Sequence, residues 1–375
     1  ITIGGSGFNA GTLGLYRFTQ TGATTQTLNT LSGTARLNLG PSTQFGGNVV
    51  FTSPRLFLDG ITVAGTATIE KTGASDDAGD GGNIFNGLTT ITNSGSGYLM
   101  TGNGNSDQFN ALTTFNNTGS HRIYFGHNHS AQTTTFVSDV ILNSNKSGGG
   151  DNWSYLVGEG ADTNISFGGN VTINCAGTIR SNHRFLNGNG SSATYNGLVT
   201  INVTNTDAST SITMGQNGTS TYNNNIIVSN ANTAGITFNA SVSATSTLNG
   251  SISIGSGYST GSLDLFRFNQ VGASANNLTL TGNSDLRIGP DTEFDGAATF
   301  KAPQVYLNGC VFQSVTDIEK TGATNDAGTG GNTFNGVTIL TNSGSGELRT
   351  GSTNPDIFNA DLTVSNTGSS LIHLA

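Results

Sequence analysis

An acidic, glycine-rich loop at residues 76–82 carries the residue types best suited to hold a metal ion. Asp76, Asp77 and Asp80 offer carboxylate oxygens, the hard ligands that Ca²⁺ prefers. The loop fits neither an EF-hand nor the Gly-Gly-x-Gly-x-Asp repeat of calcium-binding β-rolls, and the matching loop at 325–331 keeps one of the three acids. Calcium is the one candidate cofactor, with these three aspartates as its ligands, and no other cofactor is expected. The alternative is a solvated corner loop.

Trp153 and Tyr155 follow three glycines in a segment that occurs once in the chain. Exposed aromatic side chains combine an apolar face with a polar group, and such rings stack on sugar rings. Neighbouring Asp and Asn side chains can hydrogen-bond sugar hydroxyls. The sequence therefore predicts a long turn in which Trp153 and Tyr155 contact glycans. The alternative is that Trp153 packs back onto the protein.

The remaining titratable residues do not suit catalysis. Glu70 and Lys71 are adjacent on a predicted strand, so their side chains point to opposite faces and make a poor acid–base pair. His121, His127 and His129 lie close in sequence, but a zinc site needs further ligands and supporting hydrogen bonds. We expect no catalytic residues and no enzyme activity. The alternative is a polysaccharide-acting β-helix enzyme, which would need carboxylates gathered in one cleft.

A period-two pattern of apolar residues recurs along the chain. In the run 109–117, Phe109 is followed by a small residue at +2, Thr at +4, Phe at +6 and Asn at +8. This alternation predicts a strand with one buried face. The +8 asparagines are expected to form an internal amide ladder. The aromatic residues that begin such runs are expected to stack as a core ladder, formed by Phe85, Phe109, Phe136, Phe167, Tyr195, Tyr222, Phe294, Phe334 and Phe358.

Two repeats of different length define the fold class. Seven consecutive runs between residues 85 and 248 start 24 to 31 residues apart, a period that indicates a repeat architecture. We predict an all-β protein, a β-solenoid (β-helix) of about 15 coils with roughly 25 residues per coil. A longer repeat of 249 residues relates Glu70-Lys71-Thr72-Gly73-Ala74 to the same five residues at 319–323. Copy A of this repeat spans residues 5–254, and partial copy B spans residues 255–375. We predict that residues 1–375 form one continuous solenoid segment of a longer protein.

The composition of the chain excludes several classes of function and structure. The formal net charge is −9 and charged residues make up 9% of the chain, which disfavours nucleic-acid binding because phosphate contacts need Lys and Arg. We expect no membrane span, because no apolar run approaches 18 residues. Cys175 and Cys310 should lie several coils apart, too far for a disulfide. The Thr-, Asn-, Ser- and Gly-rich surface suits an extracellular polymer.

Phe-Asn-Gly-type units at 85–96, 109–120, 334–345 and 358–369 resemble the giant β-strand-repeat cell-surface adhesins of Bacteroidota. The best-known members are gliding-motility adhesins exported by the type IX secretion system. The resemblance implies a secreted filament at the cell surface, anchored by outer-membrane or secretion machinery.

Together, these features predict a non-enzymatic structural and adhesive segment of a large extracellular filament. It would act as a rigid spacer, and its surface would make weak multivalent contacts with glycans or with an abiotic surface. An alternative is a self-assembling sheath or fibre protein, in which copies of the chain associate.

Overall fold

The computed structural model describes residues 7–29, 31–128, 132–149, 151–230, 235–240, 243–255 and 257–374. The described residues form strands joined by turns and no helix. The strands are parallel and stacked as a β-solenoid of about 15 turns with roughly 24 residues per turn. This confirms the predicted fold class. The chain divides into two compact units, Ile1–Gly197 and Leu198–Ala375, which are described in turn.

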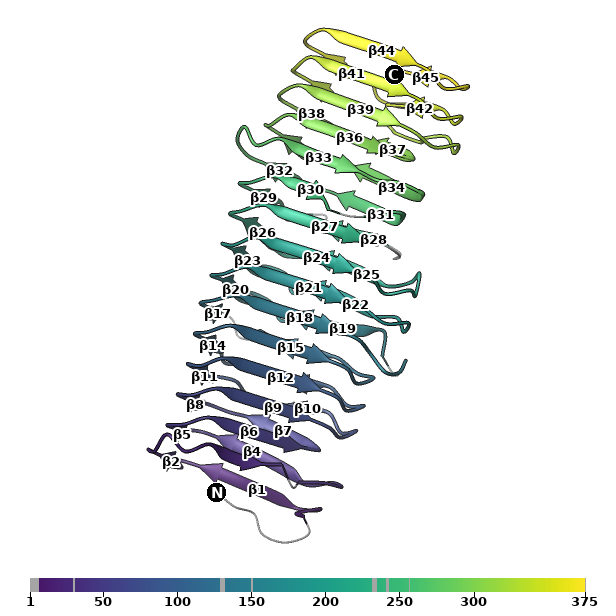
Figure 1. Ribbon diagram of the computed structural model, residues 1–375. Coiled ribbons are helices and arrows are strands. Elements are labelled where there is room, and N and C mark those ends of the chain that lie inside the picture. Colours follow the sequence, from purple (N-terminus) through teal and green to yellow (C-terminus); the bar gives the residue numbers. More distant parts are fainter. Residues whose placement is uncertain are drawn as a thin grey trace. The chain divides into compact units, whose positions relative to one another are not determined.

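In unit 1, each turn contributes one strand to each of three parallel sheets (Figure 1). The first sheet contains β2 (Thr19–Gln20), β5 (Thr43–Phe45), β8 (Ile61–Val63), β11 (Ile84–Phe85), β14 (Gln108–Phe109), β17 (Thr133–Phe136), β20 (Asn164–Phe167) and β23 (Ser192–Tyr195). The second contains β3 (Gln26–Leu28), β6 (Val49–Ser53), β9 (Ala67–Lys71), β12 (Thr89–Asn93), β15 (Thr113–Asn117), β18 (Val140–Ser144) and β21 (Val171–Cys175). The third side consists of β1 (Thr12–Tyr16), β4 (Arg36–Gly40) and β7 (Arg55–Leu58), then β10 (Asp77–Ala78), β13 (Leu99–Met100), β16 (Ile123–Phe125), β19 (Trp153–Val157) and β22 (Asn182–Phe185).

Unit 2 repeats this plan. Its first sheet contains β26 (Thr219–Tyr222), β29 (Ser246–Leu248), β32 (Phe268–Gln270), β35 (Thr292–Phe294), β38 (Cys310–Phe312), β40 (Thr333–Phe334) and β43 (Ile357–Phe358). The second contains β24 (Val199–Val203), β27 (Ile226–Asn230), β30 (Ile252–Ile254), β33 (Asn276–Thr279), β36 (Ala298–Ala302), β39 (Thr316–Lys320), β41 (Thr338–Asn342) and β44 (Leu362–Asn366). The third side consists of β25 (Ser211–Met214), β28 (Gly235–Phe238), β31 (Thr260–Leu265), β34 (Asn283–Ile288) and β37 (Gln304–Leu307), then β42 (Leu348–Arg349) and β45 (Ile372–His373).

Apart from one irregularity in β19, the paired strands of successive turns lie in register, so like positions stack on like positions. Ile91 of β12 is opposite Phe115 of β15, and Thr90 is opposite Thr114. The burial pattern of both strands alternates between buried and half-buried. Because side chains alternate across a strand, a shift by one residue would expose every core position.

The aromatic residues of the first sheet stack inside each unit. In unit 1, Phe109 lies between Phe85 and Phe136, with ring centroids 5.1 and 4.7 Å away. The stack continues through Phe136–Phe167 at 5.2 Å and Phe167–Tyr195 at 4.9 Å. In unit 2, stacked rings join Phe294 to Phe312, Phe312 to Phe334 and Phe334 to Phe358. Tyr222 is also buried and meets Phe238 edge-on. Phe358 is only half-buried, in contrast to the other eight predicted positions.

The asparagines form a ladder, but on the outer face of the second sheet. Asn143 donates to Asn116 at 3.0 Å, and Asn174 donates to Asn143 at 2.9 Å. The inward +8 residues behave differently: Asn93 Nδ2 donates to the carbonyl oxygens of Gly97 at 3.0 Å and Arg122 at 3.3 Å. The inward amides therefore bond turn carbonyls, and the amide-to-amide ladder lies one residue earlier in the strand.

A column of glycines occupies the corner after the second sheet. A side chain at Gly119 would overlap the carbonyl oxygen of Gly95, and one at Gly95 would overlap that of Gly73. The same relation holds between Gly368 and Gly344 in unit 2. Glycine is required here because the backbone of the preceding turn occupies the space of a Cβ atom.

Both cysteines are buried thiols rather than disulfide partners. Burial raises the pKa of Cys175 and that of Cys310 to about 12. Each thiol therefore remains protonated at neutral pH and behaves as a small core side chain.

Candidate functional site

The outer face of the third sheet in unit 1 carries a group of aromatic and charged side chains that contact one another. We call Tyr98, Arg122, Tyr124, Trp153 and Arg184 the arginine–aromatic strip. Strand register brings them together: Tyr124 pairs with Leu156, and Leu156 pairs with Arg184. All five side chains are half-buried.

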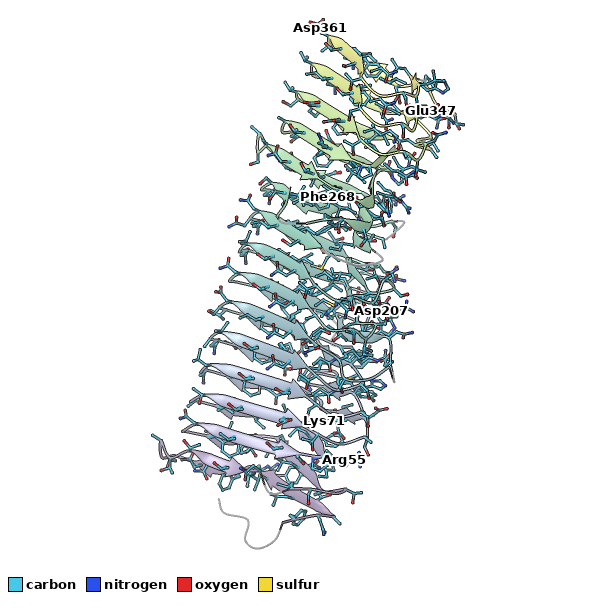
Figure 2. All side chains as sticks on the ribbon, turned by 45° about the vertical axis from the view of Figure 1, so that its right-hand side comes forward. Arg55, Lys71, Asp207, Phe268, Glu347 and Asp361 are labelled. Atoms are coloured by element: carbon cyan, nitrogen blue, oxygen red, sulfur yellow. The ribbon has the colours of Figure 1, made fainter. Side chains whose placement is uncertain are left out.

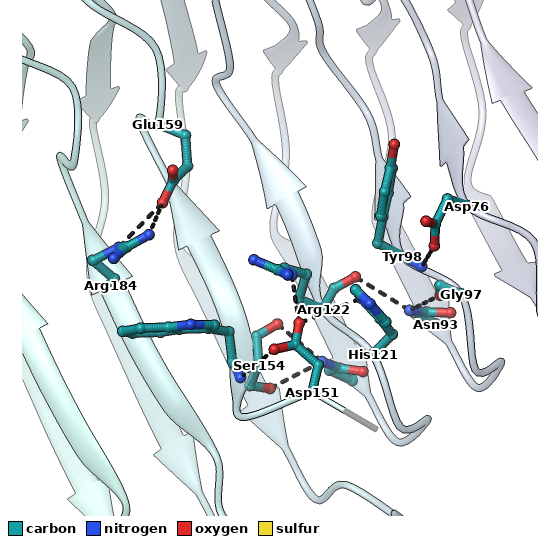
Figure 3. A network of polar contacts seen from close by, with 12 residues as sticks. Asp76, Asn93, Gly97, Tyr98, His121, Arg122, Asp151, Ser154, Glu159 and Arg184 are labelled. Atoms are coloured by element: carbon teal, nitrogen blue, oxygen red, sulfur yellow. Dashed lines mark hydrogen bonds and ion pairs between the residues drawn. The ribbon is translucent and has the colours of Figure 1, made fainter. Parts of the chain in front are cut away.

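At the centre of the strip, the Asp151 carboxylate contacts two basic side chains (Figure 3). Arg122 Nε lies 2.5 Å and His121 Nδ1 lies 3.4 Å from Asp151 Oδ2. Asp151 Oδ1 accepts the backbone N–H of Trp153 at 3.2 Å. Burial lowers the pKa of His121, although Asp151 opposes the effect. His121 is therefore mainly neutral at pH 7, and Arg122 is the cation that balances Asp151.

A second ion pair orients the indole ring. The Arg184 guanidinium donates to Glu159 Oε1 at 2.9 and 3.2 Å, and Asn187 donates to Glu159 Oε2 at 3.1 Å. The same guanidinium lies 4.3 Å from the centre of the Trp153 ring. Cation–π contact and ion pairing together hold the Trp153 side chain on the sheet surface.

The tyrosines extend the strip along the sheet. Tyr98 and Tyr124 meet edge-to-face at 5.3 Å, and Arg122 lies 5.3 Å from the centre of the Tyr124 ring. Burial is the main cause of the raised pKa values of both phenols, so both keep their hydroxyl protons at neutral pH. The strip thus offers half-exposed rings, neutral hydroxyls and two cations already balanced by carboxylates. Such a surface can stack on and hydrogen-bond a neutral polyhydroxylated ring without a net charge.

Tyr155, predicted to be exposed to glycans, lies in the core. Its side chain is 0% exposed, and its hydroxyl donates to the carbonyl oxygens of Asn143 at 2.6 Å and Phe115 at 2.8 Å. The predicted turn ends earlier than expected, because β19 begins at Trp153. A register irregularity between Trp153 and Tyr155 places one residue outside and the other inside. The glycan prediction is therefore wrong for Tyr155, while Trp153 remains at the surface.

Of the three predicted calcium ligands, Asp77 is buried, whereas Asp76 and Asp80 are exposed. Asp77 is 0% exposed, and its oxygens accept from Leu56 N at 2.8 Å and Arg55 Nε at 3.1 Å. Asp76 Oδ1 accepts the backbone N–H of Tyr98 at 2.9 Å. Within the residues that the structure describes, no three His, Cys, Asp or Glu side chains are grouped so that they could hold a metal ion. These side chains do not fit a calcium site, because Asp77 faces the interior.

Asp77 instead belongs to a buried charge cluster, which lies in the part of unit 1 where Figure 2 labels Arg55 and Lys71. Lys71 Nζ lies 3.9 Å from Asp77 Oδ2 and donates to Gly73 O at 2.7 Å. Burial lowers the pKa of Lys71 and raises that of Asp77, while Arg55 and Lys71 both oppose the rise at Asp77. The cluster thus places one carboxylate between two cations.

Unit 2 contains the equivalent pair without the arginine. Lys320 Nζ lies 4.0 Å from Asp326 Oδ1, and both side chains are fully buried. Gln304 stands in the place of Arg55. Burial raises the pKa of Asp326 to about 7, with Val305 N–H and Lys320 opposing the rise.

The other candidate residues also have structural contacts. Lys71 faces inward and Glu70 outward, and Glu70 accepts a hydrogen bond from Ser94 Oγ at 2.5 Å. His127 Nδ1 lies 3.2 Å from Asn103 Oδ1, and His129 lies outside the described residues. Sequence reasoning missed Tyr98, Arg122 and Arg184. Of these, Arg122 lies two residues before Tyr124, and this alternation could have placed both side chains on one face.

Comparison with protein-family models, with curated proteins and with solved structures gives no match. In the part of the chain that the structure describes, no helix is long and apolar enough to cross a membrane.

Proposed function

We propose that this chain is a non-enzymatic structural and adhesive segment of a large secreted cell-surface filament. The observation that carries the proposal is the solenoid itself, in which each turn repeats the core positions of its neighbours in register. The location at the cell surface, the anchoring machinery and a role in gliding motility rest on the resemblance of the Phe-Asn-Gly units to Bacteroidota adhesins.

The spacer role is supported by how the turns are joined within each unit. Consecutive turns share backbone ladders on three sides, and the longer ladders contain five residue pairs, as between β12 and β15. Stacked aromatic rings add side-chain packing along the same direction. Because each turn is held by two neighbours, local opening requires several ladders to break together. Such a segment would keep its form under load.

The adhesive role is supported by the arginine–aromatic strip. Trp153, Tyr124 and Tyr98 present rings beside Arg122 and Arg184, whose charges are balanced by Asp151 and Glu159. A shallow surface of this kind would bind a glycan weakly, and tandem display would supply the affinity. We therefore assign the contact to neutral polysaccharides rather than to charged ligands.

Bead retention tests the adhesive role. The biotinylated full chain, gathered as tetramers on streptavidin, would be passed over dextran, agarose and amylose beads. We expect retention on at least one polysaccharide and release by its free sugar. Trp153→Ala should reduce retention, whereas Tyr306→Ala should not, although Tyr306 of unit 2 also lies beside an arginine, Arg287, at 5.4 Å. Equal loss in both variants, or no retention on any bead, would reject the strip as the contact surface.

A further inference from the structure

The outer surface of the third side carries different charges in the two copies of the long repeat. Strands β4 and β7 of unit 1 correspond to β34 and β37 of unit 2 at the spacing of 249 (Figure 1). On the outward-facing positions that begin this match, Arg36 and Arg55 of unit 1 are replaced by Asp285 and Gln304 of unit 2. The two copies therefore share one strand plan but not one surface charge.

In unit 1, two arginines lie around one aromatic ring. We call Arg36, Arg55 and Phe57 the basic face. The Arg36 and Arg55 guanidinium groups lie 3.6 and 5.5 Å from the centre of the Phe57 ring. Arg55 pairs with Asp77 at 3.1 Å. Arg36 donates to Asn38 Oδ1, and no carboxylate of the described residues lies within ion-pair distance of Arg36. The basic face thus contains a cation that lacks a carboxylate.

In unit 2, two carboxylates share one arginine. We call Asp264, Asp285, Arg287 and Tyr306 the acidic face. The Arg287 guanidinium lies 2.9 Å from Asp285 Oδ2, whereas its Nε lies 4.0 Å from Asp264 Oδ1. Burial raises the pKa of Asp264, as expected for a half-buried carboxylate without a cation of its own. The acidic face thus has one carboxylate more than it has cations.

The two faces are complementary in charge and alike in construction. The unpaired guanidinium of Arg36 can form charge-assisted hydrogen bonds with carboxylates such as Asp264 and Asp285. Each face also presents a half-buried aromatic ring beside its charges, Phe57 in unit 1 and Tyr306 in unit 2. Contact between two basic faces or two acidic faces would bring like charges together, which is unfavourable. A molecule that carries both faces therefore finds its complement in another copy of itself.

We propose that the basic face of one molecule docks on the acidic face of a second copy of this chain. Because unlike faces meet, the contact is heterologous. A single contact is weak, since ion pairs that remain partly exposed contribute little, and it gains strength where many copies are held close together. This inference stands apart from the proposed adhesive function, because neither face includes a residue of the arginine–aromatic strip.

Sedimentation equilibrium of the full chain at pH 8 tests the proposal. The weight-average mass should rise with protein concentration at about 10 mM salt and should remain that of one chain at about 1 M salt, because salt screens exposed charges. Arg36→Glu and Asp285→Lys should each raise the dissociation constant by about tenfold or more, since each brings like charges together. Lys301→Glu changes the net charge as Arg36→Glu does, but it lies in the second sheet of unit 2 and should have no effect.

Two further samples distinguish lost charge pairing from damaged folding. The double variant Arg36→Glu/Asp285→Lys should associate as the unmodified chain does, because both faces have exchanged sign. An equimolar mixture of the two single variants should also associate, because each supplies the face that the other lacks. The proposal would be overturned by an unmodified chain that shows no salt-sensitive association, or by a double variant that associates as weakly as the single variants. Unchanged association of both single variants would place the contact elsewhere and would also overturn it.

Discussion

Segments 55–125 of unit 1 and 304–374 of unit 2 are copies of one sequence that differ in two instructive ways. Asp77 lies between Arg55 and Lys71, whereas Asp326 has Lys320 alone. The second difference concerns packing, because Phe109 is covered on both faces and Phe358 on one. The core pattern therefore survives duplication, while the buried carboxyl keeps only one of its two neighbouring cations.

The largest expected difference concerns the aromatic ladder. Phe109→Ala should lower the free energy of unfolding by about 3–5 kcal/mol, because it removes a fully buried ring from between two others. Phe358→Ala should cost roughly 1 kcal/mol, because one face of that ring already contacts solvent. Urea titration of the full chain, followed by tyrosine fluorescence, measures both. Equal losses would show that the open turn contributes as much as a covered one.

The next comparison removes the lysine from each cluster. Lys320→Met should destabilise by about 3 kcal/mol at pH 8, since it leaves Asp326 buried without a cation. The pKa of Asp326 is already raised to about 7, so the folded state favours the protonated acid, and the stability it contributes is lost as pH rises through that value. The cost should therefore be smaller at pH 5. Lys71→Met should cost less at pH 8, because Arg55 remains. A larger effect at pH 5 than at pH 8 would contradict the assignment of Asp326.

A third comparison concerns Asp107 and its copy Asp356. Each accepts the backbone and side-chain N–H groups of an asparagine, Asn83 or Asn332. Asp107 is buried under the next turn, and burial raises its pKa to about 7. Its contribution to stability is present at low pH and is lost as pH rises from about 4 through 7.

Asp107→Asn should consequently stabilise the chain at pH 8 by about 3 kcal/mol, the value that follows from roughly two to three pKa units. Asp356→Asn serves as the control and should change little. Urea titrations of both variants at pH 5 and pH 8 give the comparison. Stabilisation by Asp107→Asn at pH 5 that equals the stabilisation at pH 8 would point to a cause other than ionisation.

The smallest expected effect comes from restoring the missing arginine. Gln304→Arg should lower the pKa of Asp326 and stabilise unit 2 by about 1 kcal/mol at pH 8, with little change at pH 5. Gln304→Met controls for the lost hydrogen bonds of Gln304 to Tyr306 and Asn325. If Met and Arg variants have the same stability at pH 8, the arginine does not account for the difference between Asp77 and Asp326.

The sequence predicted the strands because period-two alternation is a local signal. Phe109 and the other residues that begin such runs are spaced by the solenoid turn, so their stacking follows from one repeated geometry. The prediction that Tyr155 is exposed was wrong because an irregular register beside Trp153 reverses the alternation at one residue. No local pattern reports such an irregularity.

The charged residues were harder to predict than the core. The recurrence of Lys71 and Asp77 as Lys320 and Asp326 was visible, but a loop rich in Gly and Asp usually indicates a solvated corner. Burial of Asp77 depends on Arg55, 22 residues earlier and one turn away. The strip depends likewise on register, because Arg122 and Asp151 meet across neighbouring turns.

The glycine column has a genetic consequence. Gly119 must lack a side chain because of the carbonyl oxygen of Gly95, and Gly95 because of that of Gly73, so the requirement at these corners is imposed by the preceding turn. A DNA recombination that inserts or deletes whole turns brings each glycine to a corner of the same kind. A recombination that inserts or deletes only part of a turn would place a side chain against a backbone oxygen. The fold therefore tolerates insertions and deletions that comprise complete turns, and the 249-residue duplication fits this rule.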